Sequence, residues 1–165
     1  MDDLNSRFHL IATGGTIDSY YNVDSCTPEC FEESVLPHYL QQHAMLSRQS
    51  FQFTQLCMKD SRDISPQDRE AMVERICSSP ERSIVLTHGS FTVFETARYI
   101  ADRQGSFTDK TVILTGALKP IDGFVHGDGL FNLGAAILAS QHAKPGIYVC
   151  IEGQLYLPSD RENWH

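Results

Sequence analysis

Short apolar runs alternate along this chain with segments that have helical spacing. Strands that are apolar on both faces need helices on both sides of their sheet. The pattern therefore predicts an α/β fold, a three-layer sandwich with a mostly parallel, flavodoxin-like sheet. The five expected strands are Phe8–Ala12, Phe51–Met58, Ser83–Thr87, Thr111–Thr115 and Gly146–Ile151.

Four helices are expected between these strands. Ser65 is followed by a proline and then by Asp68, the usual order of an N-cap and a first helical turn, and this helix should run to about Cys77. Apolar residues at helical spacing predict two more helices, Thr92–Gln104 and Leu130–His142. Glu29–Leu46 is also expected to be helical, with Pro37 kinking or restarting the helix.

The length and the charge of the chain limit its organisation and its partners. A length of 165 residues is typical of one domain, so we expect a single domain over residues 1–165. The chain has 21 acidic and 13 basic residues, a net charge of −8. No run of Lys or Arg offers phosphates a binding surface. We therefore expect neither a nucleic-acid partner nor a membrane association.

The sequence also indicates a compartment. Acidic residues stand at the N-terminus where a signal peptide needs positive charge, and no apolar run approaches the roughly 20 residues that span a bilayer. Five cysteines, an odd number, are typical of free thiols in a reducing cytoplasm. Cys26 and Cys30 could hold a metal, but no second Cys/His pair completes a familiar zinc site. We expect a cytoplasmic protein with no metal and no cofactor.

The loops that follow the strands carry most of the unusual polar residues. In open parallel sheets, ligands bind beyond the carboxyl ends of the strands. Gly14 and Gly15 allow a tight turn with exposed amides, and the hydroxyl of Thr16 beside them could act as a nucleophile. A plain glycine turn is the alternative interpretation. The loops are Thr13–Tyr21, Lys59–Asp63, His88–Thr92 and Gly116–Pro120.

Taken together, these loops resemble those of the bacterial-type L-asparaginases. Ala12–Ile17 is similar to the N-terminal signature of that family, and Leu86–Gly89 with Thr92 is similar to its second signature, T-H-G-T-D-T. Asp60–Asp63 matches the substrate loop, Leu114–Pro120 resembles the segment L-T-G-A-M-[RQ]-P, and Asp128–Leu133 resembles D-x-x-F-N-L. The resemblance covers almost the whole chain and points to the short-chain group with an N-terminal domain only. It implies strand order 2-1-3-4-5, with Phe8–Ala12 lying centrally.

The resemblance implies an amidohydrolase that converts asparagine or a related small amide into a carboxylate and ammonia. Thr16 would attack the side-chain amide, and either Tyr20 or Tyr21 would assist. Ser90 takes the position of a second catalytic threonine. The substrate-binding positions would be Ser61, which contacts the substrate carboxylate, Arg62 beside it, and Gly15, Asp60, Gly89, Phe91 and Ala117.

Two departures from the family pattern keep a second interpretation open. Phe91 stands where the family has an aspartate that holds the substrate ammonium. The family's catalytic lysine is expected within Leu157–His165, where Arg161, permanently charged, is the one conceivable substitute. The alternative is a catalytically impaired relative that binds a small amide or acts as a partner subunit. In either case the resemblance implies a homodimer or a homotetramer.

Three further features receive a structural interpretation. His88 is expected to be a hydrogen-bonding residue of its turn and not a general base. Asp128, with its neighbours Asp122 and His126, is expected to lie in a solvated loop. Trp164 and His165 are expected to form a frayed end or an oligomer contact.

Overall fold

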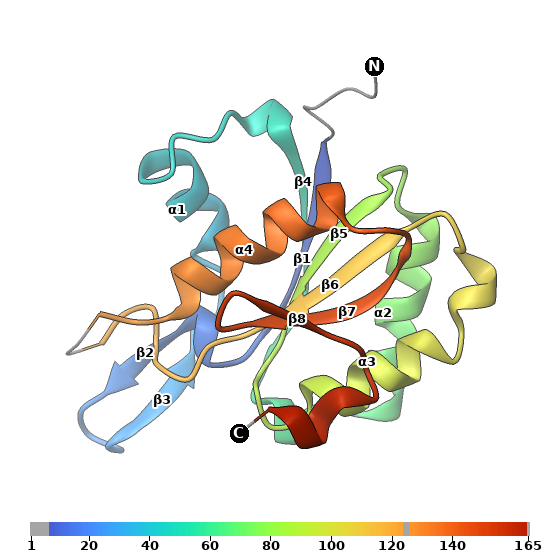
Figure 1. Cartoon of the computed structure of the whole chain (residues 1–165). Coiled ribbons are helices and arrows are strands. Elements are labelled where there is room, and N and C mark those ends of the chain that lie inside the picture. Colours follow the sequence, from blue (N-terminus) through green and yellow to red (C-terminus); the bar gives the residue numbers. More distant parts are fainter. Residues whose placement is uncertain (1–6, 124–125, 165) are drawn as a thin grey trace.

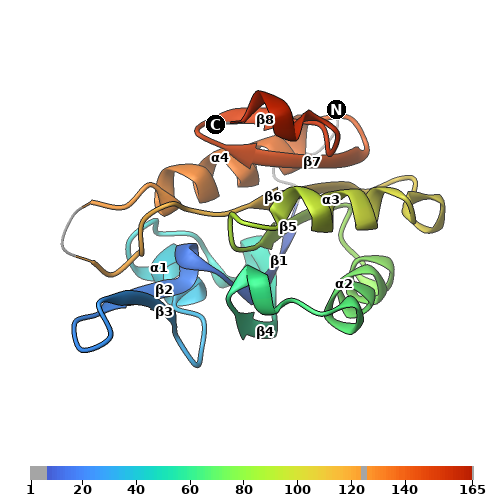
Figure 2. The same ribbon diagram turned by 90° about the horizontal axis from the view of Figure 1, so that it is seen from below.

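A six-stranded sheet lies between two layers of helices (Figures 1 and 2). The computed structural model describes residues 7–123 and 126–164. The sheet has the order β4-β1-β5-β6-β7-β8, and its first five strands are parallel. In chain order they are β1 (Phe8–Gly14), β4 (Phe51–Lys59), β5 (Ser83–Thr87), β6 (Thr111–Thr115) and β7 (Gly146–Ile151). The predicted fold class and the order 2-1-3-4-5 are confirmed, with β1 in the interior of the sheet.

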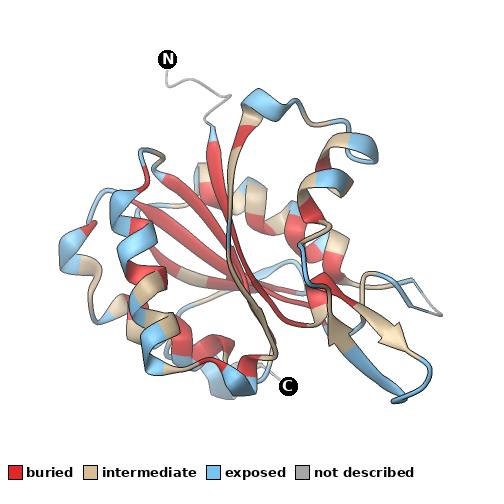
Figure 3. Cartoon of the chain, turned by 180° about the vertical axis from the view of Figure 1, so that it is seen from behind, coloured by how far each residue is buried: buried red, intermediate tan, exposed pale blue. Residues whose placement is uncertain are grey.

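Alternate side chains of the strands supply two separate cores. Ile11, Ile84 and Leu86 pack with the helices α2 (Pro66–Ser78) and α3 (Val93–Ala101) on one face. Leu10 and Val85 pack with α1 (Leu36–Gln42) and α4 (Gly129–His142) on the other face. β1, β5 and β6 are buried along their whole length, because helices cover them on both sides (Figure 3).

The last strand was not expected from the sequence. β8 (Gln154–Tyr156) pairs antiparallel with β7 after a tight turn in which Glu152 and Gly153 have φ values of 57° and 73°. With three residues, two of them exposed, β8 has no apolar pattern that could reveal it.

The predicted helix over Glu29–Leu46 is wrong for its first part. Thr27–Cys30 forms β3, which pairs antiparallel with β2 (Ser19–Asn22) in a hairpin outside the main sheet. Helix α1 begins only at Leu36 and has Pro37 in its first turn, where the missing N–H of a proline costs nothing. Pro37 therefore marks the start of a helix, the second of the two expected alternatives, and the helix ends at Gln42, before the predicted Leu46.

The other helices lie close to their predicted ranges. Ser65 and Asp68 form a reciprocal capping box at the start of α2. α3 ends at Ala101, before the predicted Gln104, and α4 begins one residue before its predicted start. Over the two described ranges, no helix has both the length and the apolar character needed to cross a bilayer.

The C-terminal segment contradicts the expectation of a frayed end. The ring of Trp164 lies 5.7 Å from the ring of Phe94 of α3, against the core on that face of the sheet. His165, which shared this expectation, lies outside the described residues. The segment therefore covers α3 instead of extending into solvent.

Candidate active site

Three turns meet at the carboxyl ends of β1, β4 and β5, and glycines make the contact possible. A Cβ atom on Gly15 would lie 2.4 Å from the amide nitrogen of Gly89. A Cβ atom on Gly89 would lie 2.7 Å from both Cβ and Oγ of Ser61. No side chain fits into such spaces, so glycine is required at both positions. These turns therefore bring Thr16, Ser61 and Ser90 to the carboxyl ends of the strands, as expected.

The first turn has a backbone that only glycine adopts readily. Gly14 and Gly15 have φ values of 90° and 81°. The amide of Gly15 donates to the carbonyl oxygen of Lys59 at 3.0 Å, which ties the end of β1 to the end of β4. Thr16 starts a short 3-10 turn over Thr16–Asp18 and is half-buried. The turn thus presents a threonine at the junction of two strand ends.

Ser61 offers an unsatisfied polar group at this junction. Its residue is 2% exposed, and its Oγ has no hydrogen-bond partner among the described residues. The hydroxyl of Thr92 donates to the carbonyl oxygen of Ser61 at 2.7 Å and fixes the backbone there. A buried hydroxyl without a hydrogen-bond partner destabilises the folded protein, and a hydrogen bond to a bound ligand could remove this destabilisation.

Asp60, Arg62 and Phe91 form the rim beside Ser61. Nε and Nη2 of Arg62 each donate to a carboxylate oxygen of Asp60 at 2.9 Å. Hydrogen bonding to Arg62 holds the pKa of Asp60 below its usual value. The guanidinium carbon of Arg62 lies 4.9 Å from the ring centre of Phe91, a residue that is 64% exposed. The Asp60 carboxylate is therefore already paired and does not face the site as a free anion.

His88 fixes the second turn through a buried chain of hydrogen bonds. Its Nδ1 lies 2.9 Å from the carbonyl oxygen of Gly89, and its Nε2 lies 3.0 Å from Oγ1 of Thr96. A carbonyl only accepts, so Nδ1 carries the proton and Thr96 donates to Nε2. Nε of Arg69 donates in turn to Thr96 at 3.1 Å. Burial lowers the pKa of His88 to about 4, so the ring is neutral and acts as a structural hydrogen-bonding residue.

Asp128 and Asn132 hold the turn after β6. The carboxylate of Asp128 accepts from the amides of Leu118 and Lys119, both at 3.0 Å, so the expectation of a solvated loop is wrong for this residue. Asn132 of α4 donates from Nδ2 to the carbonyl oxygen of Gly116 at 2.9 Å. Ala117 is buried against Gly129 and the core. The resemblance of Asp128–Leu133 to the family pattern was the signal for this role.

The two candidate tyrosines lie on the β2–β3 hairpin. The hydroxyl of Tyr20 donates to Oε2 of Glu29 at 3.1 Å, and this hydrogen bond raises the pKa of Tyr20. The amide of Tyr21 donates to the carbonyl oxygen of Asp122, which ties the hairpin to the loop after β6. Cys30, at the end of β3, donates from Sγ to the carbonyl oxygen of Gly15. The hairpin is thus attached to the turn that carries Thr16.

Arg161, the one conceivable substitute for the family's lysine, is engaged elsewhere, and so is the nearby Lys59. Nη1 of Arg161 lies 3.5 Å from a carboxylate oxygen of Glu95 on α3. Nζ of Lys59 donates to both oxygens of Asp68, at 2.8 and 2.9 Å, although the backbone of Lys59 borders the site. Within the described chain, no three His, Cys, Asp or Glu side chains converge as metal ligands would.

Comparisons with known proteins identify the fold and the family. The family model for the asparaginase N-terminal domain matches residues 7–165. Among solved structures, L-asparaginase I from Vibrio cholerae has a TM-score of 0.74 and 21% identity, over 93% of this chain and 46% of that one. A probable cytoplasmic L-asparaginase from Campylobacter jejuni has a TM-score of 0.73 and 22% identity, over 93% and 48%. The thermostable L-asparaginase from Thermococcus kodakarensis has a TM-score of 0.70 and 23% identity, over 93% and 46%.

These matches define what the chain corresponds to. It spans about half the length of each of these solved structures. At these identities the structural likeness establishes the fold, whereas the family model extends over almost the whole chain. No curated protein sequence matches the chain. The chain belongs to the asparaginase family, in which it corresponds to the N-terminal domain.

Proposed function

We propose that this chain is an amidohydrolase that releases ammonia from the side-chain amide of a small substrate, with Thr16 as the nucleophile. The observation that carries the proposal is the close contact of Gly89 with both Gly15 and the buried Ser61, because Thr16 and Ser90 directly follow the two glycines. Membership of the asparaginase family supports the reaction class.

In the proposed reaction, the Thr16 hydroxyl attacks the amide carbon and loses its proton. The amide nitrogen takes up a proton and leaves as ammonia, so Thr16 carries the acyl group as an ester. Water then attacks the ester, which frees the carboxylate product and restores the hydroxyl. Backbone amides of the two turns would stabilise the oxyanion of each tetrahedral intermediate, apart from the amide of Gly15, which already donates to Lys59.

The proton of Thr16 needs an acceptor, and we assign this role to a tyrosine of the β2–β3 hairpin. Tyr20 holds its proton firmly in this conformation, because its hydroxyl donates to Glu29 and its pKa is raised. Tyr20 could accept the proton of Thr16 only by passing its own proton to Glu29. Ser90 would place the water for the second step.

The rim residues favour a substrate without an α-ammonium group. Phe91 has no carboxylate that could bind an ammonium group, and the Asp60 carboxylate is already paired with Arg62. The unpartnered Oγ of Ser61 could instead accept or donate a hydrogen bond at the carboxylate end of the substrate. An ω-amide of a simple dicarboxylic acid, such as succinamate, fits this environment better than asparagine does.

A second candidate is a catalytically impaired protein that binds such an amide or serves as a partner subunit. The observation that favours it is the engagement of Arg161 and Lys59 by Glu95 and Asp68, which leaves neither cation to tune proton transfer. For either candidate we propose a homodimer or homotetramer in the cytoplasm. The five cysteines, all free thiols, support a reducing compartment.

The test is the release of ammonia from succinamate, asparagine and glutamine by the purified chain. The amidohydrolase proposal expects turnover that is fastest with succinamate. Saturable binding of succinamate without ammonia release would support the second candidate and contradict the first.

A further inference from the structure

Asp18 is a buried carboxylate that the proposed reaction does not use. It ends the short turn that begins at Thr16, and it is fully buried. Its Oδ2 has no hydrogen-bond partner among the described residues. Burial raises the pKa of Asp18, although Ser34 and Val35 favour the ionised form. A buried carboxylate with an unpartnered oxygen destabilises a fold, and such exceptions are concentrated at functional sites.

The side chain and the backbone of Asp18 bind the two ends of the β2–β3 hairpin. β2 begins at Ser19, the next residue, and β3 ends at Cys30. The carbonyl oxygen of Asp18 accepts from the amide of Phe31 at 3.2 Å, and its Oδ1 accepts from the amide of Val35 at 3.1 Å. The segment that leaves the hairpin is therefore bound twice to the residue that precedes the hairpin.

Asp18 also closes the turn that carries Thr16. The amide of Asp18 donates to the carbonyl oxygen of Gly15 at 3.0 Å. The hydroxyl of Ser19 donates to the carbonyl oxygen of Thr16 at 2.8 Å. Asp18 thus connects the candidate nucleophile, the hairpin with its two tyrosines and the segment that leads into α1.

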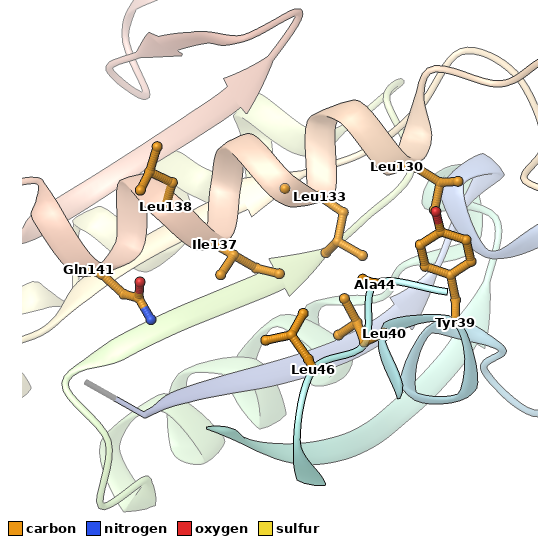
Figure 4. A pocket seen from close by; sticks show the side chains of 10 residues that line it. Tyr39, Leu40, Ala44, Leu46, Leu130, Leu133, Ile137, Leu138 and Gln141 are labelled. Carbon is orange, nitrogen blue, oxygen red and sulfur yellow. The ribbon is translucent and has the colours of Figure 1, made fainter. Parts of the chain in front are cut away.

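Helix α1 is a fixed point for this connection. Val35 directly precedes the helix, and Leu36 and Leu40 of α1 are buried in the core on that face of the sheet. Leu40 faces Leu133 of α4, which belongs to the same core (Figure 4). The hairpin buries little surface of its own, because its residues are mostly exposed or half-buried. The hydrogen bond from Val35 to Asp18 therefore attaches a peripheral hairpin to the core.

We propose that Asp18 is a positioning residue, whose carboxylate fixes the β2–β3 hairpin beside Thr16. This role rests on the proposed function, in which a tyrosine of the hairpin takes the proton of Thr16. Because Asp18 is fully buried, it acts through the hairpin and not by contact with the substrate. A misplacement of a catalytic group by about 1 Å can lower a rate by about 100-fold, so a loosened hairpin should slow the reaction.

Two substitutions separate the hydrogen bond of Asp18 from its charge. Asp18→Asn keeps an oxygen that can accept from Val35, whereas Asp18→Ala removes it. Asp18→Ala should lower kcat for succinamate by about 10-fold or more and change KM by less than about threefold, because the substrate position at Ser61 is not displaced. Asp18→Asn should keep most of kcat. The amide of Tyr21, which donates to Asp122, should exchange with solvent about 10-fold faster or more in Asp18→Ala.

Ser79→Ala is the matched control. Oγ of Ser79 is also a buried side-chain oxygen that accepts from a backbone amide, that of Glu81. Ser79 precedes β5 and so lies at the amino end of that strand, whereas the candidate site lies at the carboxyl ends. Ser79→Ala should therefore lower the free energy of unfolding, as Asp18→Ala does, but leave kcat and the exchange of the Tyr21 amide unchanged.

Circular dichroism establishes that each variant is folded before its rate is compared. A folded Asp18→Ala with the kcat of the wild type would overturn the proposal, and so would an equal loss of kcat in a folded Asp18→Asn. Unchanged exchange of the Tyr21 amide in Asp18→Ala would overturn it too. A wild-type chain that releases no ammonia would contradict the proposed function, and hydrogen exchange would then still decide whether Asp18 fixes the hairpin.

Discussion

Gly15 and Gly89 lie so close together that neither turn could carry a side chain at this point. A Cβ atom on Gly15 would lie 2.4 Å from the amide nitrogen of Gly89 and 2.5 Å from its Cα. The two residues stand 74 positions apart in the sequence, at the ends of neighbouring parallel strands. The candidate active site therefore depends on backbone packing between turns, in addition to the side chains that would do the chemistry.

Substituting Gly89 should separate the turns. In Gly89→Ala the new methyl group would meet Cβ and Oγ of Ser61 at 2.7 Å, so Ser61 or the whole turn must move. We expect a cost of about 1–3 kcal/mol in the free energy of unfolding and a loss of ammonia release of about 100-fold or more. Gly105→Ala is the matched control, because nothing lies within 4 Å of its Cβ position. Full activity in Gly89→Ala would show that the close contact is not needed.

Stability should fall with acid because of two buried histidines. Burial lowers the pKa of His88 to about 4, and burial with the charges of Arg75, Lys110 and Arg7 lowers that of His9 to about 4. The unfolded chain binds these protons near pH 6.5, so it holds more protons than the folded chain between pH 6.5 and pH 4. The free energy of unfolding should therefore decrease as the pH falls through this window, by up to about 1.4 kcal/mol per pH unit for each histidine.

Urea denaturation at a series of pH values measures this slope. His88→Asn, whose side-chain amide can still donate to the Gly89 carbonyl, should remove about half of it. A second loss belongs to Asp68: burial opposes its ionisation, but Lys59 and Ser65 hold its pKa at about 2. That stabilisation is present above about pH 4 and is lost only as the pH falls towards 2. An unchanged slope in His88→Asn would contradict the assignment of a neutral His88.

Substrate preference should depend on Arg62 and Phe91 together. Phe91→Asp restores the family's carboxylate, but Arg62 lies over this ring at 4.9 Å and would pair with the new carboxylate. The single variant should therefore change preference little. Combining it with Arg62→Ser should raise kcat/KM for asparagine relative to succinamate by about 10-fold or more. This factor corresponds to the free energy that one charge-assisted hydrogen bond contributes. An equal shift in Phe91→Asp alone would mean that Arg62 does not control this position.

The sheet could be predicted from the sequence because its strands are buried on both faces. Runs such as Ser83–Thr87 are apolar at nearly every position, and their order follows from the family resemblance. The β2–β3 hairpin could not be predicted in this way. It lies outside the sheet, and its residues are mostly exposed or half-buried, so no core imposes an apolar pattern on them.

The candidate site likewise combines features that the sequence indicates with features that only the structure shows. The turn at Gly14 and Gly15 is visible in the sequence because glycine readily adopts its backbone, whereas Gly89 was indicated by the family resemblance. Pairings such as Arg62 with Phe91, or Asp128 with the amides of Leu118 and Lys119, depend on how distant loops are placed. Nothing local in the sequence encodes the first pairing, and only the family resemblance of Asp128–Leu133 points to the second.

The most direct test of the central claim compares ammonia release from succinamate by the wild-type chain, Thr16→Ala and Thr16→Ser. Removal of a half-buried loop hydroxyl should change the free energy of unfolding by no more than about 0.5 kcal/mol. If Thr16 is the nucleophile, Thr16→Ala should lose activity by a factor of about 10⁴ or more at unchanged stability, and Thr16→Ser should keep part of it. Equal rates of ammonia release from the wild type and a folded Thr16→Ala would contradict the account.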